Sequence, residues 1–158
     1  MIFVTVGSQL PFDRMTDAVA AWARARGRSD VFFQTGGSAV DVAGFESAPM
    51  LDSAGIQRQF DRATVVVAHA GTGTMIECML RGTPVIVMPR SAALHETRND
   101  HQFATARKFA SRAGVFVAWD EKELPALLDR AATLAGGTGI KPHAEESLLS
   151  ALRAFAAE

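Results

Sequence analysis

The chain has 158 residues with 16 basic and 17 acidic side chains, and 48% of its residues are hydrophobic. This length fits one domain, so we expect a single domain over residues 1–158. The formal net charge of −1 leaves no basic excess to neutralise phosphates, which argues against nucleic acid as a partner. The single cysteine, Cys78, excludes an internal disulfide and a cysteine-cluster metal site, and its apolar helical neighbours predict a buried position.

The N-terminal sequence MIFVTVGSQLPF has no basic leader before its apolar run, and Gly7 ends that run early. The run is therefore typical of a first strand rather than of a signal peptide. No apolar run reaches the roughly 18 residues of a membrane-spanning helix. These features predict a cytoplasmic protein, for which peripheral attachment to a membrane stays open.

Short apolar runs alternate with helical patterns in chain order. Strands are predicted at residues 2–6, 31–34, 65–68, 85–88 and 115–117, and helices at 12–22, 57–62, 74–81, 97–112, 124–131 and 148–155. Residues 38–55 show weak periodicity and receive no element, and Gly136, Gly137 and Gly139 mark a break. The alternation predicts one Rossmann-like, doubly wound α/β domain with a parallel sheet.

Two of the predicted helices carry an expected inward face. In the helix at 74–81 this face is formed by Met75, Ile76, Met79 and Leu80. In the helix at 97–112 it includes Phe103 and Ala110.

Three polar loops follow predicted strands, and ligands of open parallel sheets bind outside the carboxyl ends of the strands. In the first loop, Gly7 allows a ligand to approach the backbone closely, and Ser8 is a possible donor to a phosphate oxygen, with Gln9 beside it. A tight strand-to-helix turn without any ligand explains the same residues.

The second loop places glycines and threonines at the start of a helix, in the run His69-Ala70-Gly71-Thr72-Gly73-Thr74. Free N–H groups and the helix dipole at such a position favour a diphosphate. No Gly-Lys-Ser follows and the G-x-G-x-x-G spacing is absent, which argues against a kinase and against NAD binding. His69 fits a structural role in ordering the loop.

Glu77 follows Thr74 at capping-box spacing, so its carboxylate has two explanations. It either satisfies the start of the helix or accepts the hydroxyls of a ribose.

The third segment runs from Arg90 to Asp100-His101-Gln102 and enters the helix at 97–112. Asn99 or Asp100 could be an ordinary N-cap. The run also places Asp100, His101 and Gln102 consecutively at a helix start facing the same crevice, with Arg90 nearby, and these side chains suit sugar hydroxyls and a diphosphate. No spacing typical of a metal site occurs, so no metal is expected.

Together these segments resemble the C-terminal domain of glycosyltransferase family 28. The resemblance is carried by His69-Ala70-Gly71-Thr72-Gly73-Thr74-x-x-Glu77, by Gly82-x-Pro84-x-Ile86-x-x-Pro89 and by Asp100-His101-Gln102. The beginning, Val4-Thr5-Val6-Gly7-Ser8-Gln9 with Pro11-Phe12, is similar to small bacterial exopolysaccharide glycosyltransferase subunits. These are relatives of the donor-binding subunit of the two-subunit N-glycan GlcNAc transferase.

The resemblance implies a GT-B donor domain that binds a UDP-sugar as substrate and needs no cofactor. It assigns the diphosphate to the Gly7-Ser8 loop and to residues 71–74, the ribose to Glu77, and the sugar with its phosphates to residues 100–102. The uracil pocket would lie near residues 50–56. A membrane-anchored partner subunit would supply the site for a lipid-linked acceptor and hold this chain at the inner face of the membrane. The general base is expected from the partner, with His69 and His101 as weaker candidates.

Two other functions remain open from the sequence. A non-catalytic, regulatory module that binds a nucleotide-sugar would have the same loops. A nucleotide-sugar epimerase has a related architecture but requires two domains in one chain, and 158 residues argue against it.

Overall fold

Short strands rich in valine and phenylalanine form a parallel sheet at the centre of the molecule. The computed structural model describes residues 1–137 and contains one sheet of six strands in the order β3-β2-β1-β4-β5-β6, every neighbouring pair parallel. The strands are β1 Ile2–Thr5, β2 Val31–Gln34, β3 Glu46–Ala48, β4 Val65–His69, β5 Val85–Met88 and β6 Val115–Val117. This topology confirms the predicted doubly wound α/β fold.

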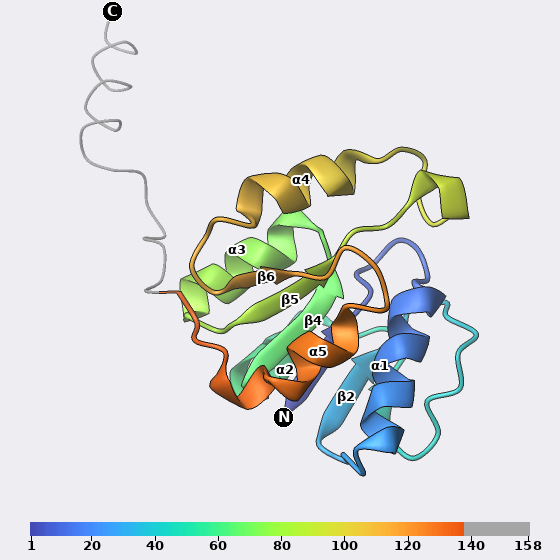
Figure 1. Cartoon of the computed structure of the whole chain (residues 1–158). Helices are drawn as coiled ribbons and strands as arrows, with labels where there is room; N and C mark the ends of the chain where they lie inside the picture. Colours follow the sequence, from blue (N-terminus) through green and yellow to red (C-terminus); the bar gives the residue numbers. More distant parts are fainter. Residues whose placement is uncertain (138–158) are drawn as a thin grey trace, which may run out of the picture.

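Helices cover both faces of the sheet (Figure 1). They are α1 Asp13–Ala25, α2 Ser53–Arg62, α3 Thr72–Arg81, α4 His101–Phe109 and α5 Leu124–Asp129, with 3-10 turns at Ala92–Leu94 and Ala131–Thr133. Helices α1 and α5 pack on one face, and α2, α3 and α4 pack on the other.

Side-chain alternation along the strands separates two hydrophobic cores. On β4, Val65 and Val67 pack into the α1–α5 core, whereas Val66 and Ala68 pack into the α2–α4 core. Both faces of the central strands are therefore buried, which explains why β4 is a continuous apolar run.

The order of the strands reverses between β1 and β4, because the chain winds outward from β1 in one direction and from β4 in the other. The loops after β1 and β4 therefore diverge at their carboxyl ends and leave a crevice between them. Both loops had been singled out from the sequence as polar and glycine-bearing.

Several element boundaries differ from the prediction. The weakly periodic stretch 38–55 contains the edge strand β3 and the start of α2, whose N-cap Asp52 accepts a hydrogen bond from the Gly55 N–H at 2.6 Å. Helix α3 begins two residues earlier than predicted, and α4 spans only part of the predicted 97–112.

The inward faces of two helices were also partly wrong. In α3 the buried residues are Met75, Cys78 and Met79, while Ile76 and Leu80 are more than one-third exposed. In α4, Ala106 is buried and Ala110 is exposed. The buried position predicted for Cys78 is confirmed.

The predicted helix at 148–155 and Gly139 lie outside the described residues. Within residues 1–137, no helix is both long enough and apolar enough to span a membrane.

Candidate functional site

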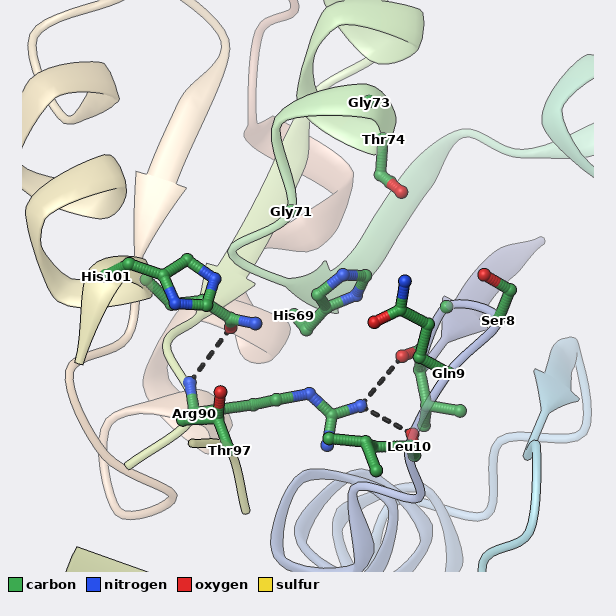
Figure 2. Close-up of a pocket in the computed structure, with 13 residues that line it drawn as sticks. Ser8, Gln9, Leu10, His69, Gly71, Gly73, Thr74, Arg90, Thr97 and His101 are labelled. Atoms are coloured by element: carbon green, nitrogen blue, oxygen red, sulfur yellow. Dashed lines mark hydrogen bonds between the residues drawn. The ribbon is translucent and has the colours of Figure 1, made fainter. Parts of the chain in front are cut away.

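A cleft of about 340 Å³ opens at the carboxyl ends of β1, β4 and β5, where the strand order reverses (Figure 2). All but three of the residues predicted for the site line it, the exceptions being Thr72, Glu77 and Asp100. The lining residues are Val6, Gly7, Ser8, Gln9, Leu10, His69, Gly71, Gly73, Thr74, Arg90, Thr97, His101 and Gln102. The structure thus brings together the three loops that the sequence identified separately.

The loop after β1 turns sharply at Gly7, whose φ of +82° lies in the left-handed region that favours glycine. The Gly7 N–H donates to Thr5 Oγ1 at 3.2 Å, and the Gly7 carbonyl accepts from Gln34 Nε2 at 3.1 Å. Gln34 also accepts from Thr5 Oγ1 at 2.6 Å. Two buried polar side chains beneath the loop therefore fix its first turn.

The loop after β4 leads directly into α3, with Gly71 as the N-cap and no side-chain cap. Thr74 and Glu77 lie inside the helix, so the capping-box explanation of Glu77 is wrong. The Glu77 carboxylate instead accepts from Arg81 Nε at 2.6 Å. The first N–H groups of α3 point out of its N-terminus, which makes this end of the cleft favourable for an anion.

The His69 ring occupies a narrow slot between two glycines. A Cβ built on Gly7 would lie 2.5 Å from His69 Cε1, and one built on Gly71 would come closer still to Nε2. His69 Nδ1 is buried and has no hydrogen-bond partner within the described part of the chain. Burial, together with the charges of Arg90 and His101, lowers the pKa of His69 to about 4, so the imidazole is neutral at pH 7.

The loop after β5 is held by buried polar contacts. Gln102 Oε1 accepts from the Arg90 N–H at 3.1 Å, and the Arg90 guanidinium crosses the cleft floor to the loop after β1 (Figure 2). Burial lowers the pKa of Arg90 from its ordinary value. The Glu96 carboxylate accepts from Arg14 Nε and Nη2, both at 2.8 Å, which ties this loop to the start of α1.

Some polar residues at the start of α4 make hydrogen bonds within the chain, and others face the cleft. Asp100 is the N-cap residue by position, but its carboxylate accepts from the Ala92 N–H at 2.8 Å instead of capping α4. The Asn99 side chain accepts from the His101 N–H at 3.2 Å. His101 and Gln102 face the cleft, whereas Asp100 does not line it.

A second cavity of about 270 Å³ adjoins the first and shares Gly7, Ser8 and Thr74 with it. Its remaining lining residues are Thr5, Gln34, Met50, Leu51, Asp52, Ser53, Ile56 and Phe60. It includes the stretch near residues 50–56 that had been expected to hold a base. Gln34 was missed at the sequence level, although it is the one polar residue at the end of the strand VFFQ.

Residues 1–137 contain no group of three or more His, Cys, Asp or Glu side chains placed to hold a metal ion. Burial raises the pKa of Cys78 to about 12, so this thiol is not a nucleophile at neutral pH.

The glycosyltransferase family 28 C-terminal domain model matches residues 1–135. The chain belongs to this family. No curated protein sequence matches this chain.

Solved structures share its fold. MurG of Acinetobacter baumannii superposes with a TM-score of 0.64 at 16% identity over 85% of this chain and 42% of MurG. The spinosyn forosaminyltransferase SpnP superposes with a TM-score of 0.58 at 16% identity, over 82% of this chain and 34% of SpnP. This chain therefore spans less than half the length of these two proteins.

A third similar structure has almost the same length as this chain. The solution structure of ALG13 superposes with a TM-score of 0.60 at 17% identity, over 96% of this chain and 94% of ALG13. At this identity the likeness shows a common fold.

Proposed function

We propose that residues 1–158 form the donor-binding subunit of a two-component, UDP-sugar-dependent glycosyltransferase. Its partner would be a membrane-anchored, acceptor-binding subunit, with which it transfers a sugar to a lipid-linked acceptor in bacterial polysaccharide biosynthesis. The subunit would thus work at the inner face of the membrane, like the small exopolysaccharide subunits that its N-terminal motif resembles.

The observation that carries the proposal is the pairing of two cavities around one anion-favouring helix end. The first cavity contains the N-terminus of α3 and the glycine turn after β1, where backbone N–H groups suit a diphosphate. The second cavity is more apolar and lies directly beside it, with Met50, Ile56 and Phe60 among its walls. A nucleoside diphosphate matches this arrangement, because its flat base is joined through a ribose to two phosphates.

In this proposal the chain stabilises the leaving group. UDP gains negative charge as its bond to the sugar breaks, and fixed N–H dipoles placed around the phosphates lower the energy of that transition state. His69 fits a hydrogen-bonding role toward the phosphates. With its pKa lowered to about 4 it is a weak general base at neutral pH, which favours a base from the partner.

Calorimetric titration of the purified chain tests donor binding directly. UDP should bind, and ADP, GDP and NAD should bind at least about tenfold more weakly if the second cavity selects a pyrimidine. Preference for one of the purine nucleotides would overturn the proposal.

Transfer is tested separately by co-expression with a candidate membrane subunit. Sugar transfer from a UDP-sugar to a lipid-linked acceptor should require both chains. Selective UDP binding without transfer in any such pair would favour a binding module over an enzyme subunit.

A further inference from the structure

Arg90 is a buried cation whose hydrogen bonds go to backbone carbonyls. The residue is 3% exposed, and its guanidinium lies 4.6 Å from the centre of the Phe12 ring. Nη2 donates to the carbonyls of Val6 at 2.9 Å and Leu10 at 2.6 Å, and Nη1 donates to those of Pro11 and Glu96. Three of these four carbonyls belong to the loop after β1.

This arrangement uses both terminal nitrogens of the guanidinium completely. Each carries two N–H donors, and each makes two hydrogen bonds, so only the Nε–H has no hydrogen-bond partner among residues 1–137. A direct phosphate ligand normally presents the paired donors of its fork to the anion. Arg90 turns that fork toward the loop.

The loop is held from the other side as well. Gln34 binds the Gly7 carbonyl and Thr5 binds the Gly7 N–H. The carbonyls of residues 6, 7, 10 and 11 are therefore all engaged by side chains. By contrast, the N–H groups of residues 8, 9 and 10 have no hydrogen-bond acceptor among residues 1–137.

Arg90 holds the loop on both sides of these free N–H groups, because it binds the Val6 carbonyl on one side and the Leu10 and Pro11 carbonyls on the other. Each N–H shares a planar peptide group with the carbonyl of the preceding residue, so the Gly7 carbonyl held by Gln34 fixes the direction of the Ser8 N–H. The clamped ends of the loop restrict the N–H groups of Gln9 and Leu10 between them. Residues 8, 9 and 10 line the cleft, opposite the N-terminus of α3.

We propose that Arg90 is a positioning residue that orients the loop 6–11 so that its free N–H groups bind an anion in the cleft. The anion is the diphosphate only if the proposed function holds, but the orienting role does not depend on it. Arg90 acts through the loop and does not itself contact the ligand.

Arg90→Lys is the informative variant. A lysine keeps the charge, but its single ammonium has only three donors, one fewer than the four hydrogen bonds that the two terminal nitrogens of Arg90 make. Arg58→Lys is the matched control, because Arg58 is exposed on α2 and makes no ion pair within the described chain.

The first readout is the backbone order of residues 7–10 in the ligand-free protein, from amide relaxation. In the wild type and in Arg58→Lys these amides should be as ordered as the strands. In Arg90→Lys their order parameters should fall below about 0.6, while the amides of β4 and β5 stay unchanged. An ordered loop in Arg90→Lys would overturn the proposal.

The second readout is UDP affinity, which should fall about tenfold or more in Arg90→Lys and stay constant in Arg58→Lys. Lost affinity with an unchanged loop would make Arg90 a direct ligand and overturn the proposal. A disordered loop with full affinity would also overturn it. If UDP fails to bind the wild type, the proposed function fails, and the relaxation data still decide the role of Arg90.

A third measurement needs only the wild type and covers the case in which the variant does not fold. The Nη protons of a hydrogen-bonded arginine exchange slowly and give resolved signals. These signals should be present without ligand and barely move on adding UDP. Large UDP-induced shifts at Nη would contradict a positioning role.

Discussion

Gly7 and Gly71 enclose the His69 ring, and they can do so because neither has a side chain. Each stands where a methyl group would overlap the imidazole, so their backbones approach the ring more closely than any other residue type allows. Gly73, two residues after Gly71, has open space around its position instead. The same loop therefore provides both a test position and a control.

Gly71→Ala should displace His69, because the new Cβ would fall on the ring. We expect a loss of about 1–3 kcal/mol of unfolding free energy from overpacking, measured by urea titration. Gly73→Ala should keep or slightly raise stability, by up to about 1 kcal/mol, since alanine is favoured in a helical first turn. Equal stability of the two variants would show that His69 has room to move.

The lowered pKa of His69 makes stability depend on pH. Above its unfolded pKa of 6.5 the ring is neutral in both states and contributes nothing. As the pH falls from 6.5 toward about 4, the unfolded chain takes up a proton and the folded chain does not, so stability falls. Between pH 7 and pH 5 this loss should be about 2 kcal/mol.

The measurement is urea unfolding at pH 7 and pH 5. The loss between the two pH values should be absent in His69→Asn. The loss of stability should persist in His95→Asn, which removes an exposed histidine. Asparagine is well tolerated at this position because the φ angle is +57°. An equal loss in wild type and His69→Asn would place the pH sensitivity elsewhere.

Glu77→Ala tests the remaining explanation of this carboxylate. Since Glu77 does not cap α3, its removal should cost the ligand-free protein only about 0.5 kcal/mol, the value of a partly exposed ion pair with Arg81. If the carboxylate accepts ribose hydroxyls, UDP affinity should fall about tenfold by calorimetry. Asp61→Ala removes the other carboxylate on Arg81 and should leave affinity unchanged.

At the scale of elements, prediction from the sequence worked where burial on both sides of a strand made long apolar runs. It failed where tertiary contacts decided the outcome. Strand β3, with the sequence ESA, has no strand pattern of its own and forms because β2 offers its edge. The inward face of α3 was misread because Cys78 lies between Met75 and Met79 on the helix and replaces Ile76 and Leu80 at the sheet.

The loops that line the site were predictable from the sequence, but the buried side chains that hold those loops were not. Glycines after strands mark the turns, so the cleft residues on loops 7–9 and 69–74 could be named in advance. The roles of Gln34 and Arg90 depend on which carbonyls they meet across the fold, and spacing along the chain does not encode those contacts.

Helix α2 begins at a side-chain cap that the sequence did not reveal. Asp52→Ala should lower stability by about 1 kcal/mol, because the Gly55 N–H loses its acceptor. Asp52→Asn should retain most of that stability, as asparagine caps about equally well. Ligand-free thermal unfolding measures this effect, and equal losses in both variants would point to the carboxylate charge rather than the cap.

At the scale of the whole molecule, one sheet separates two cores, and the two tryptophans report on one core and on the partly exposed surface beside α4. Trp22 is buried in the α1–α5 core, and Trp119 stacks on Phe103 of α4 with ring centroids 6.5 Å apart. Because the strands belong to both cores, neither core can be lost alone. We expect a single cooperative unfolding transition.

Trp22→Phe and Trp119→Phe each leave one tryptophan as a probe. In either variant, fluorescence and far-ultraviolet circular dichroism should give the same urea midpoint. A fluorescence midpoint that precedes the circular dichroism midpoint in one variant would show that the surroundings of its remaining tryptophan unfold first.

The two outer strands of the sheet, β3 and β6, are only three residues long each. An edge this short offers few unpaired main-chain groups, so another chain cannot extend the sheet by more than a few hydrogen bonds. Association with a second protein by strand addition is therefore weak at either border. A lasting complex has to be built from side chains, on the helices or on the loops at the strand ends.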